Sequence, residues 1–302
     1  MLRDAVLPIG AVAMATAVLR SEQVFRRDKR DRPVDVELHQ LAHRITGEGD
    51  STIVFIHGWP DDPAIFHRTV ARLSSRYRCV NVCLPNYPAP FGYVPACLPE
   101  RTYGYEMDEA ATLLYATMRK TCPSTSHVTL FMHDWGCIVG YLVAARYKVD
   151  RLVSLDVGWF AQKVPPPSGI PGRLVGAAAV LAYQGLLNVF FLLPTALGSA
   201  LSSAEAALLG RFAAPDAGPV VASMDWPYRS MWRSVVTWNP GVIPQLDGFQ
   251  PQCPWLFVYG TKLPSFLRFQ DEGFIKRVEA SCPGVSRAVP IGVGALVASS
   301  CG

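Results

Sequence analysis

Short β-rich runs alternating with segments of helical periodicity are the feature that most restricts how this chain can fold. Helices are expected at 106–119 and 137–147, where apolar residues recur at helical spacing. Five β-rich runs are expected to be strands: 52–56, 79–84, 127–132, 151–155 and 254–259. Strands that alternate with helices predict an α/β fold, with a mostly parallel sheet flanked by helices on both faces.

A long insertion separates the last two expected strands. It runs from 165 to 249, opens with three prolines, and contains no charged residue between 174 and 201. We interpret it as a helical cap, interrupted at Pro194; a membrane-facing lid or second span is the alternative. The core is therefore expected at 21–164 and 250–302, on either side of this cap. With 302 residues, the chain is long enough for one large core.

The N-terminal segment, residues 1–20, is expected to be an anchor or targeting segment. Its apolar run at 5–19 is shorter than the roughly 20 residues that a membrane span needs. A basic stretch follows at 20–32, as in a juxtamembrane or targeting flank. We therefore expect membrane association through the N-terminus or the cap, or an organellar location, with a cytoplasmic location as the alternative.

Composition argues against two kinds of partner, namely nucleic acids and metal ions or cofactors. The net charge of +4 is mild and comes mostly from one stretch, whereas a nucleic-acid binder shows a basic stripe on a folded face. Eight cysteines are scattered without a Cys-x-x-Cys pair or a histidine cluster, so no metal and no cofactor are expected. In a chain of this length, such cysteines are more often buried reduced thiols than a disulfide framework.

The central chemical signal is the sequence Met-His-Asp-Trp-Gly-Cys at 132–137, between an expected strand and an expected helix. A nucleophile at such a position sits on a sharp turn and needs small neighbours. Gly136 is one, while Met132 is larger than usual. The residue at the tip is Asp134 and not serine, so covalent catalysis would pass through an alkyl ester of its carboxylate. Simple helix capping by this aspartate is the alternative.

A second element, His-Gly-Trp-Pro-Asp at 57–61, follows an upstream strand in the place of an oxyanion loop. The backbone N–H groups of Trp59 and Trp135 are expected to stabilise negative charge while an ester of Asp134 is hydrolysed. The occurrence of both elements in one chain favours a hydrolytic site over two unrelated turns.

On these two motifs, at 57–60 and 133–136, the chain resembles the epoxide hydrolase and haloalkane dehalogenase branch of the α/β-hydrolase superfamily. The resemblance covers about residues 36–290. It implies the α/β-hydrolase fold and an aspartate that opens an epoxide or displaces a halide. It also implies a histidine that activates water, and an acidic residue that orients this histidine.

The cap favours epoxide opening among these reactions. The resemblance implies two cap tyrosines that donate to the epoxide oxygen, and Tyr183 and Tyr228 occupy similar positions. A phenol with its usual pKa near 10 is protonated at neutral pH and can donate in this way. Either tyrosine could instead be an ordinary cap residue. Haloalkane dehalogenation ranks second, because Trp59 stands where many dehalogenases carry asparagine.

The chain departs from this branch at its acid and its base. No carboxylate follows the strand at 254–259, and Asp156, after the strand at 151–155, is expected to be the orienting acid; its alternative role is to cap the entry to the insertion. The branch places its histidine near position 295, where this chain has Ala295. All six histidines precede Asp134.

Two interpretations of the C-terminal part follow from the absent histidine. Either the chain is a truncated or altered form of an enzyme, or it is a relative that keeps the pocket without turnover. We expect an epoxide-hydrolase-like enzyme acting on a lipophilic small molecule. The alternatives are a catalytically inactive binding protein of the same fold and a dehalogenase-like hydrolase.

Overall fold

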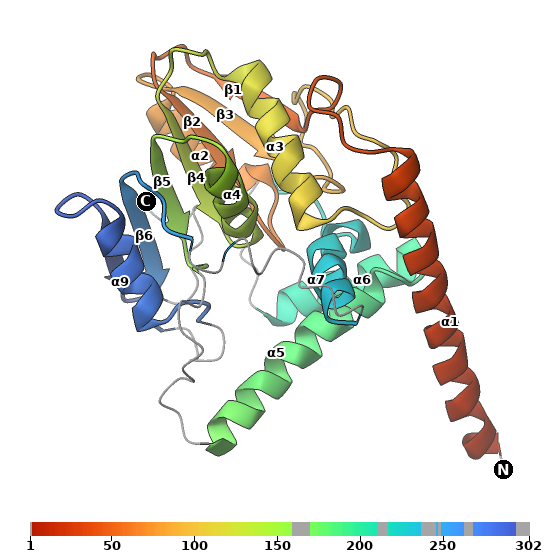
Figure 1. Ribbon diagram of the computed structural model, residues 1–302. Helices are drawn as coiled ribbons and strands as arrows, with labels where there is room; N and C mark the ends of the chain where they lie inside the picture. The colour runs from red at the N-terminus through yellow and green to blue at the C-terminus, as the bar shows by residue number, and fades with distance from the viewer. Residues whose placement is uncertain are drawn as a thin grey trace.

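A seven-stranded, mostly parallel sheet forms the centre of the chain (Figure 1). The computed structural model describes residues 2–158, 170–209, 217–236, 246, 249–262 and 268–293. The strand order is β1-β3-β2-β4-β5-β6-β7; β1 pairs with β3 in antiparallel fashion, and the remaining neighbours are parallel. The strands are β1 (Ala42–Thr46), β2 (Thr52–Ile56), β3 (Arg78–Cys83), β4 (Val128–His133), β5 (Arg151–Leu155), β6 (Trp255–Gly260) and β7 (Arg287–Ile291).

Helices cover the sheet and form the insertion. The helices are α1 (Leu2–Asp31), η1 (Pro63–Phe66), α2 (His67–Leu73), α3 (Met107–Thr121), α4 (Trp135–Arg146), α5 (Ile170–Phe190), α6 (Thr195–Leu208), η2 (Ala222–Asp225), α7 (Trp226–Val236) and α9 (Glu272–Ser281). The helices α5, α6 and α7 all lie between β5 and β6 in the sequence, and α5 packs on both of the others. These observations confirm the expected fold class, including the helical insertion.

Continuous apolar sequence explains the central strands. All five residues of β2 are buried, because both faces of this parallel sheet are covered by helices. Side chains from neighbouring strands, such as Val54, Leu130 and Leu152, meet in one core with almost no exposed surface. The break between α5 and α6 falls where it was expected, with Pro194 at the start of α6.

The helix α1 runs through residue 20, so the expected end of the N-terminal segment falls inside one continuous helix. The C-terminal half of α1 packs on the rest of the chain through Ser21, Phe25 and Asp28, all of which are buried. Its N-terminal half projects away from the other elements (Figure 1). Among the described residues, no helix combines the length and the apolarity needed to cross a bilayer.

Candidate active site

Asp134 occupies a sharp turn between β4, which ends at His133, and α4, which begins at Trp135. Its φ of 51° and ψ of −126° lie outside the regions that a residue with a side chain usually adopts. Such backbone strain is found most often at functional sites. The Asp134 side chain makes no capping hydrogen bond to α4, so simple helix capping does not explain this residue.

Small residues make the turn sterically feasible. A Cβ on Gly136 would collide with the carbonyl oxygens of Ile56 and His57. A Cβ on Gly140 would collide with the sulfur of Met132, so the large residue before the turn is accommodated by a glycine one helical turn further along α4. The large Met132 side chain, which looked unfavourable in the sequence, is therefore accommodated because residue 140 is a glycine.

The loop after β2 brings an N–H donor to the Asp134 carboxylate. The backbone N–H of Trp59 donates to Oδ2 of Asp134 at 2.8 Å. A Cβ on Gly58 would overlap this carboxylate and the Trp135 nitrogen, so only glycine permits the approach. The backbone N–H of Trp135 also acts on the carboxylate and, like that of Trp59, lowers its pKa. The structure thus brings the expected N–H groups of Trp59 and Trp135 close to the Asp134 carboxylate.

Burial dominates the electrostatics of this carboxylate. It raises the pKa of Asp134 to about 7, against the opposing effect of the Trp135 and Trp59 N–H groups. The negative charges of Asp61 and Asp156 raise this pKa further. At neutral pH the group is therefore shared between a neutral acid and a nucleophilic carboxylate.

Both expected cap tyrosines lie at this site. Tyr228, on α7, meets the rings of Trp59 and Trp135 edge-on at 5.5 Å and 5.2 Å between centroids. The ring of Tyr183, on α5, meets that of Tyr228 edge-on, with 6.0 Å between their centroids. Burial raises the pKa of both phenols, and the charge of Asp134 adds to this effect. Both tyrosines therefore remain protonated donors at neutral pH.

The indole of Trp135 also contributes to this group. Its ring packs on that of Tyr228, and Gln184 donates to the Tyr183 hydroxyl at 3.0 Å. Ring contacts and this hydrogen bond thus connect the turn at Asp134 with the two cap helices.

Asp156 lies at the same edge of the sheet, directly after β5, with a φ of 62°. It is buried, and its Oδ1 accepts the backbone N–H of Gly260 at 2.9 Å. Its charge acts on Asp134, which places the two carboxylates near each other. The position of Ala295, where the related branch has its histidine, lies outside the described residues.

His57 follows β2 directly, close to the Asp134 turn, but it has a structural role. Its Nδ1 contacts the carbonyl oxygens of Gly58 and Asp61, and its Nε2 accepts the N–H of Leu84 at 3.0 Å. Burial lowers its pKa to about 4, so the ring is neutral at pH 7. With both nitrogens engaged, His57 fixes the loop and is not placed to activate water.

Two residues of the site were not anticipated from the sequence. Asp225 is fully buried and accepts the indole Nε1–H of Trp59 at 2.8 Å and the hydroxyl of Ser202. Tyr87 is buried against His57, and its hydroxyl has no hydrogen-bond partner among the residues that the structure describes. Neither belongs to a sequence motif, because each reaches the site through contacts distant in the sequence.

The fold is that of the α/β hydrolases, and an aspartate stands at the turn between β4 and α4. The chain belongs to the alpha/beta hydrolase family, which matches residues 53–284. A curated relative is a cis-3-alkyl-4-alkyloxetan-2-one decarboxylase of Shewanella oneidensis, 29% identical over 129 residues. This match covers 40% of the present chain and 37% of the relative, so the chain spans little more than a third of that protein's length.

Solved structures with the same fold include two epoxide hydrolases. A laboratory-evolved variant of a potato epoxide hydrolase is similar with a TM-score of 0.58 at 18% identity, covering 87% of this chain and 92% of that one. A putative epoxide hydrolase from Klebsiella pneumoniae gives 0.56 at 15%, covering 85% and 88%. The haloalkane dehalogenase DbjA gives 0.56 at 17%, covering 84% and 87%. These similarities show the fold.

Proposed function

We propose that this chain opens an epoxide through a covalent ester at Asp134. The observation that carries the proposal is the Asp134 carboxylate, held by the N–H of Trp59 and facing two protonated phenols. The site thus combines a nucleophile for a carbon atom with acids for the oxygen atom that leaves it.

The reaction balances with the groups of this site. A carboxylate oxygen of Asp134 forms a bond to one ring carbon, and the bond from that carbon to the epoxide oxygen breaks. The oxygen takes a proton from Tyr228 or Tyr183, which gives a hydroxyalkyl ester. Water would then attack the carbonyl carbon of this ester, with Trp59 and Trp135 stabilising the oxyanion. The bond between the carbonyl carbon and the alkyl oxygen breaks to release the diol, and the proton left over from water returns to the tyrosinate, which restores the tyrosine and the Asp134 carboxylate.

The second step determines whether the chain turns over. His57, the histidine that follows β2 beside the Asp134 turn, is engaged on both nitrogens and is not placed to activate water. We therefore expect the ester to form and to be released slowly. In the extreme case the chain is a binding protein that captures an epoxide without releasing product.

Intact mass spectrometry after incubation with styrene oxide or a long-chain terminal epoxyalkane tests both steps. The expected result is a gain of one epoxide mass, located on the Asp134 peptide and absent from Asp134→Ala. A lasting adduct favours the binding protein, whereas diol release without an adduct favours turnover by another base. Diol formation that survives in Asp134→Ala would overturn the proposal.

A second candidate reaction is suggested by the decarboxylase relative. An oxetan-2-one is also a strained oxygen ring, and its fragmentation to an alkene and carbon dioxide consumes no water. A site without a base for water is compatible with this stoichiometry. Alkene and carbon dioxide released from a cis-dialkyl oxetan-2-one, measured by gas chromatography, would separate this reaction from epoxide opening.

Haloalkane dehalogenation is the weaker alternative. It requires N–H donors around the departing halide, but the indole N–H of Trp59 is already donated to Asp225. Halide release from an alkyl halide would test it directly.

A further inference from the structure

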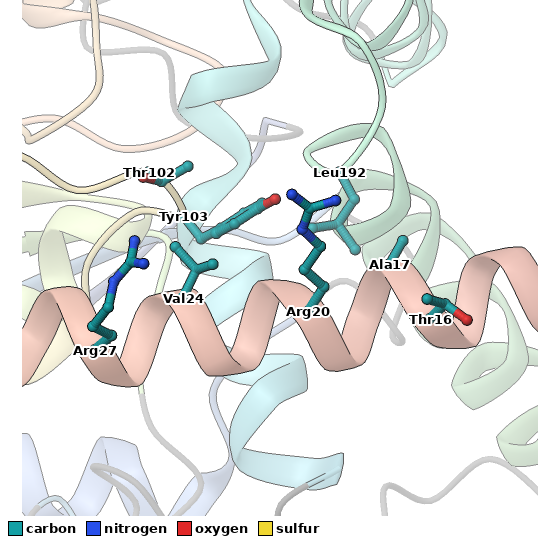
Figure 2. Close-up of a pocket in the computed structure, with 8 residues that line it drawn as sticks. All are labelled: Thr16, Ala17, Arg20, Val24, Arg27, Thr102, Tyr103 and Leu192. Atoms are coloured by element: carbon teal, nitrogen blue, oxygen red, sulfur yellow. The ribbon is translucent and has the colours of Figure 1, made fainter.

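A cleft separates α1 from the loop that precedes α3 (Figure 2). It has a volume of about 660 Å³ and no acidic side chain among its lining residues. Its apolar part comes from α1 and from the turn after α5, and its polar part from α1 and the loop. The lining residues are Thr16, Ala17, Arg20, Val24, Arg27, Thr102, Tyr103 and Leu192.

Two arginines give this cleft its charge. Arg20 and Arg27 are seven residues apart on α1, about two helical turns, so both lie on the same face. Figure 2 shows both guanidinium groups on the side of α1 that faces Tyr103, with Arg20 close to the Tyr103 hydroxyl and Arg27 towards Thr102. An anionic group between them would meet two cationic donors and a phenol.

The neighbouring basic residues are already neutralised. Arg26 pairs with Glu22 at 2.7 Å, and Arg30 pairs with Asp31 at 2.8 Å. By contrast, Arg20 forms no ion pair with any residue that the structure describes, and Arg27 pairs with the Asp28 carboxylate at the longer distance of 3.4 Å. Among these arginines, Arg20 at the cleft is therefore the one without an acidic partner in the part of the chain that the structure describes.

The surroundings of the cleft are apolar. The sequence of α1 that precedes it, residues 5–19, is apolar, and Leu19 is 66% exposed. Exposed leucines also occur on two cap helices, at Leu181 and Leu186 of α5 and Leu197 of α6. An apolar segment next to basic side chains is a pattern that favours binding to an anionic bilayer surface.

We propose that the Arg20–Arg27 cleft binds the phosphate of an anionic phospholipid, so that α1 docks the chain on a bilayer surface. The helix α1 also contacts the cap: Arg229 of α7 donates to Ser21 at 2.7 Å, and Tyr228 is its neighbour in the sequence. Docking would therefore bring the cap close to the phase in which a lipophilic substrate dissolves.

Vesicle flotation of the full chain tests the proposal. Vesicles of phosphatidylcholine alone are compared with vesicles that also contain phosphatidylglycerol, and we expect strong binding only to the latter. Each basic residue near an anionic surface contributes about 1 kcal/mol, so Arg20→Gln/Arg27→Gln should lower partitioning about thirtyfold. Asp134→Ala should bind as the wild type does, which keeps this test independent of the proposed reaction.

Arg26→Gln/Arg30→Gln is the matched control, since it removes the same charge from the same helix outside the cleft. Its loss should be far smaller, because both arginines are already paired. Equal losses in the two double variants, or wild-type binding that ignores phosphatidylglycerol, would overturn the proposal. So would thermal stabilisation by inorganic phosphate without vesicle binding, or self-association that depends on Arg20 and Arg27 without vesicle binding.

Discussion

The indole Nε1–H of Trp59 donates a 2.8 Å hydrogen bond to Oδ1 of Asp225. The two residues belong to different parts of the fold, since Trp59 follows β2 in the core and Asp225 ends η2 in the insertion. The backbone N–H of the same tryptophan holds the Asp134 carboxylate. One side chain of the insertion therefore fixes the loop that holds the Asp134 carboxylate.

Substitution of Asp225 should separate its hydrogen bonding from its charge. Asp225→Ala leaves the Trp59 indole and the Ser202 hydroxyl unpaired, and should lower the free energy of unfolding by about 1–3 kcal/mol. Asp225→Asn can still accept from Trp59, and its amide can donate to Ser202, so it should keep most of the stability. Urea unfolding of both variants measures the difference.

The pH dependence of Asp225→Asn has a definite sign. Burial raises the pKa of Asp225 to about 7 from its usual value of 3.8. Its contribution to stability is therefore complete below about pH 4 and is lost as the pH rises through 7. Relative to the wild type, Asp225→Asn should become more stable over this range. A constant difference from pH 4 to 8 would contradict the raised pKa.

Formation of the ester should follow the ionisation of Asp134. Only the carboxylate is nucleophilic, and burial raises the pKa of this group to about 7. The adduct rate should rise about tenfold per pH unit below 7 and level off above it. Mass spectrometry of samples quenched at successive times, at pH values from about 5 to 9, measures this profile. An adduct rate that has already reached its plateau at pH 5 would show that Asp134 has the pKa of an ordinary aspartate.

The cap tyrosines should affect the same step. Tyr228→Phe or Tyr183→Phe removes one proton donor to the epoxide oxygen, so each should slow adduct formation about tenfold to a hundredfold, and the double variant should slow it more. Tyr115→Phe is the control, because Tyr115 stacks on Tyr147 away from the site. Wild-type adduct rates in the double variant would remove both tyrosines from the mechanism.

The central part of the fold was predictable because its signals are local. The strands β2 and β5 have the bounds expected from their apolar runs, and the turn at Asp134 was evident from a motif between a strand and a helix. The edge strands β1 and β7 were not predicted. Both are partly exposed, and Pro290 lies within β7, so neither shows the continuous apolar pattern of a central strand.

Contacts between residues that are far apart in the sequence could not be predicted. In the sequence, the entire basic stretch after the apolar N-terminal run suggested a segment that flanks a membrane. In the structure, Lys29 pairs with Glu106 and Arg32 with Glu100, both more than sixty residues away. Only the three-dimensional arrangement separates these paired residues from Arg20, which has no ion pair among the described residues.

Gly136 and Gly140 should differ in how their substitution can be compensated. Gly136→Ala forces a Cβ against backbone oxygens that cannot move independently, and should cost about 3 kcal/mol or more. Gly140→Ala meets only the flexible end of Met132, and should cost about 1–3 kcal/mol. Adding Met132→Val should relieve Gly140→Ala but not Gly136→Ala. Strictly additive unfolding free energies for both pairs would contradict this account.

Tyr87 and Tyr141 form a natural comparison of a buried hydroxyl with and without a partner. The Tyr141 hydroxyl donates to the carbonyl oxygen of Val157 at 2.9 Å, whereas that of Tyr87 has no partner among the described residues. An unsatisfied buried polar group costs about 1–3 kcal/mol, so Tyr87→Phe should leave the free energy of unfolding unchanged or raise it. Tyr141→Phe should lower it by about 1 kcal/mol. Equal losses of unfolding free energy in the two variants would mean that the Tyr87 hydroxyl is hydrogen-bonded in solution. If Tyr87→Phe keeps its stability but forms the adduct more slowly, the Tyr87 hydroxyl contacts the ligand beside Asp134.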